Sequence, residues 1–222
     1  AATRYIENSL EQRRSILGDY HVETLASMSN LGRSYNRLDR SEDAVLLYKT
    51  CLEVVDSLLG KSHYYYAGIL GNLGNSEMLA GDYKSARIHF EESQELYREL
   101  LPEDHRLQAN PYLALAKLAV KENNLQEARQ LFEKGVQIRQ EALPEGHFLI
   151  AQSQQALGEC LMNLGDYSTA IEYLELAKES FAKSVEFEND LLAVYESLIT
   201  AYLEIQDQEK AELYQKQITA RG

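Results

Sequence analysis

Residues 17–21 read Leu17-Gly18-Asp19-Tyr20-His21, and this short phrase decides the fold because it returns three more times along the chain. Each copy opens with Leu-Gly or Leu-Pro and ends on a histidine, and the copies are 42 residues apart. Gly and Pro are helix stop signals, since Gly tolerates left-handed backbone and Pro cannot continue the helical ladder. A period held this strictly predicts stacked repeats. The four histidines that mark it are His21, His63, His105 and His147.

Two amphipathic segments lie between each pair of consecutive motifs. Apolar or small residues fall at steps of three and four over residues 22–38, and again over residues 44–58. This spacing puts them on one face of a helix. Each repeat is therefore predicted to be helix A, a tight turn and helix B.

Small residues recur where the two helices of a repeat would approach each other. Helix A carries Gly32 and helix B carries Ala44, with the large Tyr48 one turn later. Such alternation of small and large residues lets helices interdigitate at separations of about 8–10 Å. The helix A position is occupied in the four repeats by Gly32, Gly74, Ala116 and Gly158.

The repeats cover the whole chain. We therefore predict an all-α fold, a right-handed α-solenoid of stacked antiparallel helix pairs, forming one domain over residues 1–222. Residues 2–17 match helix B alone, so we expect that further residues precede Ala1 and that this helix exposes Ile6, Leu10 and Ile16. The last step is one residue short, which puts Glu188 at the histidine position. The predicted units are 1–18 (a partial repeat), 19–60, 61–102, 103–144, 145–185 and 186–222, the last ending in a polar cap helix.

Composition restricts the class of partner. The net charge is −13 and the isoelectric point is about 4.9, whereas nucleic acids and anionic membranes select basic surfaces. No run of about 18 apolar residues occurs, so membrane insertion is not expected. Cys51 and Cys160 fall in different repeats and are interpreted as small core residues of a reduced, cytoplasmic protein.

Sequence motifs for catalysis are missing. There is no phosphate-binding loop, HExxH, nucleophile elbow or paired CxxC, so we expect no enzyme, no cofactor and no metal site. Equivalent residues of successive repeats should lie about 15–20 Å apart, too far for two histidines to bind one zinc ion. Their rings are expected to bond a backbone group at the start of helix A. His89 lies inside a helix B with no ligand cluster beside it.

The repeat template resembles the tetratricopeptide repeat. Leu-Gly in helix A, Tyr three residues later and Ala at the start of helix B carry this resemblance, and the 42-residue period with Leu-Gly/Pro-x-x-His resembles the kinesin-light-chain type. The resemblance implies a concave wall lined by helix A and binding of varied protein partners. Repeats of this type also occur in bacterial signalling proteins, often next to kinase, protease or NTPase modules. The chain departs from the template at Glu77, where Tyr is expected, and at Gln154, where an aromatic residue or Leu is expected.

Polar and basic residues are predicted on the helix A wall. Asn offers a donor and an acceptor to an extended peptide backbone, and the resemblance implies this role for Asn30 and Asn72. Arg and Lys offer charge-assisted bonds to carboxylates. The wall turns acidic later, at Glu159, Glu196 and Glu204. The predicted ligand-binding residues are Asn30, Arg33, Asn36, Arg37, Asn72, Asn75, Lys117 and Lys121.

Each of these features has a plainer interpretation. The wall residues can be ordinary solvated positions. Gly68 and Gly71 can leave room for a ligand side chain or only for a neighbouring helix. Residues 64–66, all Tyr, can anchor a ligand at the groove edge, although packing between repeats is the commoner use.

The leading functional hypothesis is a scaffold that binds a peptide or flexible protein segment, with acidic groups, in the concave groove. A second hypothesis is a regulatory or sensory module that packs against a catalytic domain of the same full-length chain. A third is self-assembly through the exposed ends of the solenoid.

Overall fold

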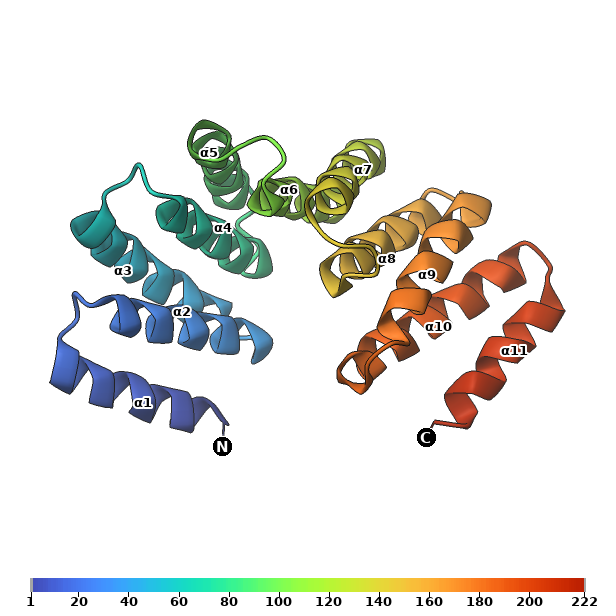
Figure 1. Ribbon diagram of the computed structural model, residues 1–222, viewed down its shortest axis with the longest axis horizontal. Coiled ribbons are helices and arrows are strands. Elements are labelled where there is room, and N and C mark those ends of the chain that lie inside the picture. Colours follow the sequence, from blue (N-terminus) through green and yellow to red (C-terminus); the bar gives the residue numbers. More distant parts are fainter. Residues whose placement is uncertain (1, 222) are drawn as a thin grey trace. The chain divides into compact units, whose positions relative to one another are not determined.

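A computed structural model describes residues 2–221 (Figure 1). Within that range the regular structure consists of eleven α-helices and two short 3-10 helices. Contacts divide the chain into two compact units, residues 1–103 and 104–222, and each is described by itself. Both units are built from consecutive antiparallel helix pairs, which confirms the predicted all-α class.

The first unit holds five helices, and each packs on the next along the chain (Figure 1). By repeat position, α1, α3 and α5 are B helices, and α2 and α4 are A helices. In addition, α2 touches α4, so successive A helices are neighbours. The bounds are α1 Ala2–Leu17, α2 Val22–Arg37, α3 Ser41–Leu59, α4 Tyr64–Leu79 and α5 Tyr83–Leu100.

The second unit continues the alternation with two short 3-10 turns ahead of A helices. Each A helix again packs on the following B helix, and each B helix on the next A helix. The bounds are η1 Arg106–Gln108, α6 Ala109–Lys121, α7 Leu125–Ala142, α8 Phe148–Asn163, α9 Tyr167–Phe181, η2 Val185–Phe187, α10 Glu188–Glu204 and α11 Gln208–Thr219.

The glycines of helix A lie where the partner helix comes closest. A Cβ on Gly32 would lie 2.6 Å from Cζ of Tyr48, and one on Gly74 would lie 2.7 Å from Cε1 of Phe90. Such distances are shorter than carbon atoms tolerate. The predicted close approach of helices A and B is therefore confirmed, and the large rings beneath it are fully buried.

The four histidines cap the segments that follow them. In each case Nδ1 accepts a hydrogen bond from the backbone N–H two residues later, at 3.1–3.2 Å. This satisfies one of the free donors at a helix start and confirms the expected backbone role of the ring. In the last repeat the cap is Ser184, whose Oγ accepts from Glu186 N–H at 3.3 Å. Glu188, expected at the histidine position, instead begins α10 because η2 precedes it.

Every A–B turn contains one residue with left-handed backbone. Two of the five are glycines, Gly81 and Gly165, at φ of 87° and 76°. Asp39, Asn123 and Gln206 take the same place with φ of 56°, 60° and 63°. Asp and Asn tolerate this region better than other non-glycine residues, which accounts for the turns at Asp39 and Asn123 but not for the one at Gln206.

The first helix buries more than expected. Leu10 was expected to be exposed but is 4% exposed, because it packs into the apolar cluster that contains Leu25 and Met28 of α2. Ile6 is half-buried, and Ile16 is 79% exposed. Among the described helices, α1 packs mainly on α2.

Candidate functional site

Three of the predicted wall residues come together on α2. The side chains of Asn30, Arg33 and Arg37 are exposed and line one groove between α1 and α2. Asn30 Oδ1 accepts a hydrogen bond from the Arg33 guanidinium. The spacing of three and four residues places all of them on one face of the helix.

The groove has a volume of about 450 Å³ and basic walls. Of the described residues that line it, none is Asp or Glu, although the whole chain carries a net charge of −13. Unpaired guanidinium groups in a shared groove attract carboxylates or phosphates. The lining residues are Tyr5, Ile6, Ser9, Arg13, Ser27, Asn30, Arg33, Ser34 and Arg37.

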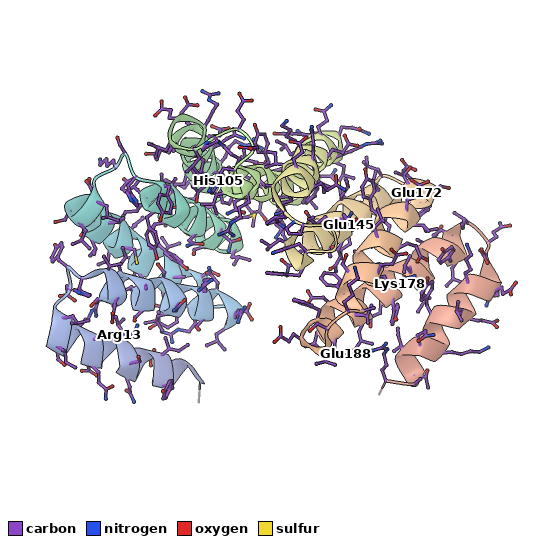
Figure 2. All side chains as sticks on the ribbon, in the orientation of Figure 1. Arg13, His105, Glu145, Glu172, Lys178 and Glu188 are labelled. Atoms are coloured by element: carbon purple, nitrogen blue, oxygen red, sulfur yellow. The ribbon has the colours of Figure 1, made fainter. Side chains whose placement is uncertain are left out.

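Arg13 is the third arginine of this groove, and the sequence analysis missed it. It extends from α1 toward α2, where its guanidinium donates to Glu23 O at 3.4 Å and to Ser27 Oγ (labelled in Figure 2). These two bonds orient the guanidinium, and both use the same terminal nitrogen, Nη1. The remaining N–H donors of Arg13 add to the positive charge that Arg33 and Arg37 bring to the same groove.

The three remaining asparagines occupy different surroundings. Asn36 is half-buried and its Nδ2 donates to Ser76 Oγ of α4 at 2.9 Å, while its Oδ1 is buried without a partner among the described residues. Asn36 therefore joins successive A helices. Asn72 and Asn75 are half-buried on α4.

In the second unit, Lys117 and Lys121 are exposed on α6. Desolvation and the positive charge of Arg139 lower the pKa of Lys117, and the nearby Glu159 opposes that shift. Arg139 is only 9% exposed, and its burial lowers its pKa to about 10. Its guanidinium donates to Leu149 O at 2.5 Å, and no described carboxylate pairs with it.

Arg13 and Arg139 occupy the same position of helix B, three repeats apart. The other repeats hold Val55, Tyr97 and Phe181 there, all buried. Each arginine donates to the carbonyl ten residues ahead, in the first turn of the next A helix. An arginine at a core position was the signal in the sequence that could have identified both.

Residues 64–71 pack mainly within the first unit. A Cβ on Gly68 would lie 3.2 Å from Tyr97 Oη, so Gly68 leaves room for α5 rather than for a ligand. Tyr66 is buried, and Tyr65 packs against the same apolar cluster. Tyr64 is 45% exposed and lies against His63, with ring centroids 4.5 Å apart. Packing between repeats is thus the main role of Tyr65 and Tyr66.

Family comparison agrees with this geometry. A model described as tetratricopeptide repeat matches residues 1–57 and 65–141, and a second one of that description matches residues 151–184. The chain belongs to the tetratricopeptide repeat family. Repeats of this family mediate interactions between proteins, and their fold is typically that of a non-catalytic scaffold.

Solved tetratricopeptide structures share the fold. A Podosopora anserina protein described as a kinesin light chain with nearly identical TPR-like repeats is 24% identical, with a TM-score of 0.71 over 88% of this chain and 93% of that one. BtubC (BKLC) of P. vanneervenii is 19% identical, with a TM-score of 0.81 over 98% and 88%. These neighbours share the predicted helical-repeat fold. No curated protein sequence matches the chain.

A third similar structure belongs to a larger protein. It is a signal transduction ATPase with numerous domains from Pyrococcus horikoshii that carries a tetratricopeptide repeat sensor. The identity is 16% and the TM-score 0.72, over 95% of this chain but 32% of that one. At such identity the likeness concerns the fold.

Residues 2–221 were also compared with the requirements of membrane spans and metal sites. None of the helices is both long and apolar enough to span a membrane. Nor do three or more His, Cys, Asp or Glu side chains come together as a set that could hold a metal ion. Cys51 and Cys160 are free and buried, as expected of core residues.

Proposed function

We propose that this tetratricopeptide repeat protein binds an acidic peptide or flexible protein segment along its A helices. In the first unit, carboxylates of the ligand lie against Arg33 and Arg37. In the second unit, Lys117 and Lys121 offer a separate pair of ammonium groups to an acidic segment. Amide side chains of Asn30, Asn72 and Asn75 hold its backbone. Binding of this kind makes and breaks no covalent bond in the ligand. It needs only a surface that is complementary to the ligand in shape and charge.

The observation that carries the proposal is the basic groove between α1 and α2. Arg13, Arg33 and Arg37 line it together with Asn30, and the described lining residues include no acid. Arginine is suited to carboxylates because its planar fork donates two parallel hydrogen bonds. In a chain of net charge −13, a local cluster of three arginines favours an acidic ligand selectively.

Selection from a random peptide library tests the proposal without a known partner. We expect the wild-type chain to enrich Asp and Glu over the input library. A variant carrying Arg33→Ala, Arg37→Ala, Lys117→Ala and Lys121→Ala should lose this enrichment while circular dichroism shows an intact fold. The matched control changes four other exposed lysines to Ala and should keep it: Lys49, Lys84, Lys134 and Lys216. If the peptides selected by the wild-type chain contained no more Asp and Glu than the input library, the proposal would be wrong.

A second candidate function is a sensor that packs against a catalytic module in cis. The similarity to the repeat sensor of the Pyrococcus horikoshii protein favours it. The full-length gene tests it directly, because a flanking kinase, protease or NTPase motif is required. If the surrounding reading frame encodes only further repeats, the sensor function is excluded and the scaffold remains.

A further inference from the structure

A second groove lies in the second unit, across the last turns of α7 and α9 and the first half of α8. It has a volume of about 370 Å³, at the lower end of the range of ligand pockets. Gln154 and Ile150 of α8 line it together with Leu176 and Ser180 of α9. The groove therefore combines polar and apolar surface within one unit.

Gln154 is the residue that distinguishes this groove. It is 4% exposed, yet its side-chain amide forms no hydrogen bond with any described residue. Among the described residues, the fully enclosed side-chain atoms without a partner are Ser29 Oγ and Asn36 Oδ1, so the Gln154 amide is accessible from the groove that it lines. A buried polar group without a partner destabilises the fold. A ligand that bonds to this amide would offset that cost.

Two large apolar residues of the repeat template are replaced by polar ones at this groove. The position of Gln154 is occupied by Met28 in the first repeat, and that of Ser180 by Val54 in the first and Ile138 in the third. These three residues are buried core residues. Gln154 thus makes this part of the groove polar, and the small Ser180 leaves space in it.

The Gln154 amide selects a ligand that offers both a donor and an acceptor. Its Nε2 donates and its Oε1 accepts, so a carboxylate would satisfy only the first and an ammonium group only the second. A carboxamide satisfies both at once, through two hydrogen bonds. Ile150 and Leu176 provide apolar surface for the methylene groups that carry the carboxamide.

The charged residues of the groove favour a ligand without a carboxylate. Glu145 (labelled in Figure 2) and Glu179 line it with one cation, Lys183. Lys183 Nζ lies close to the α7–α8 loop, where a Cβ on Gly146 would come within 2.6 Å of it. No described residue forms an ion pair with any of these three side chains. The net negative charge disfavours a free amino acid, which carries an α-carboxylate, more than a residue inside a protein chain.

We propose that this groove binds a glutamine or asparagine side chain of a partner protein segment. The carboxamide pairs with the amide of Gln154, its methylene groups lie against Ile150 and Leu176, and Glu145 and Glu179 favour a basic residue next to it. The site is separate from the basic groove of α1 and α2 and does not depend on it. It prefers an uncharged amide, whereas the basic groove prefers a carboxylate.

Two short peptides test the preference. One is acetyl-Lys-Gln-Lys with an N-methylamide end, and the other has Glu in place of Gln. Each is titrated against the full chain while NMR follows the side-chain amide signals of its glutamines. We expect the Gln154 signals to shift with the glutamine peptide, which should bind roughly ten-fold more tightly than the glutamate peptide.

Gln154→Met separates binding from folding. It puts in place the residue of the first repeat, which is close to glutamine in length but has no amide. The affinity for the glutamine peptide should fall about ten-fold or more, whereas the melting temperature should rise by about 2–4 °C because the unpaired buried amide is removed. The matched control is Gln152→Met, at an exposed glutamine of the same helix, and should change neither quantity.

Three results would overturn the proposal. They are equal affinity for the glutamine and glutamate peptides, undiminished binding by Gln154→Met, and a lower melting temperature of that variant, which would show that the amide stabilises the fold. Tighter binding of free L-glutamine than of the peptide would contradict the assignment to a protein segment. None of these results bears on the proposed function, whose test depends on Arg33, Arg37, Lys117 and Lys121.

Discussion

His89 Nδ1 lies 2.6 Å from Oε2 of Glu77, and this pair joins helices B and A of one repeat. Glu77 stands where the repeat template has Tyr, and His89 stands where the first repeat has Leu47. The side chain of Glu77 is 5% exposed and that of His89 is 24% exposed. Two departures from the template thus compensate each other.

Replacing His89→Leu should destabilise the protein by about 2 kcal/mol, because it leaves the buried Glu77 carboxylate without its partner. Adding Glu77→Tyr restores the pair of residues found in the first repeat, Tyr35 and Leu47, and should recover most of the loss. Chemical denaturation of the single and double variants measures both effects. Strictly additive losses would show that the two side chains do not act as a pair.

Gly74 and Gly71 provide a matched pair of substitutions on α4. Gly74→Ala puts a Cβ 2.7 Å from Phe90 Cε1, and overpacking of this kind costs about 1–3 kcal/mol. In Gly71→Ala the new Cβ lies 3.7 Å from Ser93 Oγ, an ordinary contact. That substitution should stabilise the helix by up to about 1 kcal/mol. Thermal melting distinguishes the two, and equal shifts would contradict the assigned helix contact.

Arg139→Met should stabilise the second unit by about 1 kcal/mol, because an unpaired buried charge gives way to an apolar side chain of similar length. The carbonyl of Leu149 keeps a hydrogen bond from Ser153 Oγ at 3.0 Å. Burial lowers the pKa of Arg139 to about 10. The folded state therefore disfavours the cation, and the destabilisation persists at every pH below that value. A variant less stable than wild type in urea would contradict this account.

The acid sensitivity of the second unit should depend on Glu175. Burial opposes its ionisation, but hydrogen bonds from Lys178, Tyr214 and Tyr202 prevail and lower its pKa below the ordinary 4.5. Tyr214 Oη donates to Glu175 Oε1 at 2.5 Å, and Tyr202 Oη at 3.0 Å. A lowered folded pKa contributes stability above the unfolded value, and this is lost as pH falls through the folded pKa.

Melting curves of wild type and Glu175→Gln between about pH 7 and about pH 3 check this expectation. The variant should be less stable by about 1–2 kcal/mol at neutral pH, and the gap should narrow in acid as the wild-type carboxylate is protonated. Tyr202→Phe removes one of the hydrogen-bond donors to Glu175. Its stability should differ from that of wild type by a smaller amount, and this difference should also narrow in acid. If the stability difference between wild type and Glu175→Gln did not change with pH, it would not arise from ionisation of Glu175.

Much of the fold follows from sequence periodicity alone. The 42-residue spacing predicted the helix pairs, the close approach at Gly32 and Gly74, and the backbone role of the histidines. Each of these depends on local residue type and register. The cap at Ser184 was not predicted, because the inserted η2 turn shifts the start of α10 away from the strict period.

The candidate site was predictable only in part. Register placed Asn30, Arg33 and Arg37 on one face, and the groove unites them. It could not show that Asn36 bonds to Ser76, since such a contact depends on how successive helices approach. Arg13 could not be predicted from the helix A register, because it lies at a position of helix B that Val55 and Phe181 occupy as core residues in other repeats.

Charge reversal is the most direct measurement of the central claim, that arginines on the A helices recognise an acidic segment. A library-selected acidic peptide and its lysine-substituted counterpart are titrated by calorimetry against wild type and against Arg33→Glu with Arg37→Glu. We expect the reversed protein to lose the acidic peptide and to gain the lysine peptide, giving a coupling of about 1–2 kcal/mol. Affinities that change by the same factor for both peptides would contradict the claim.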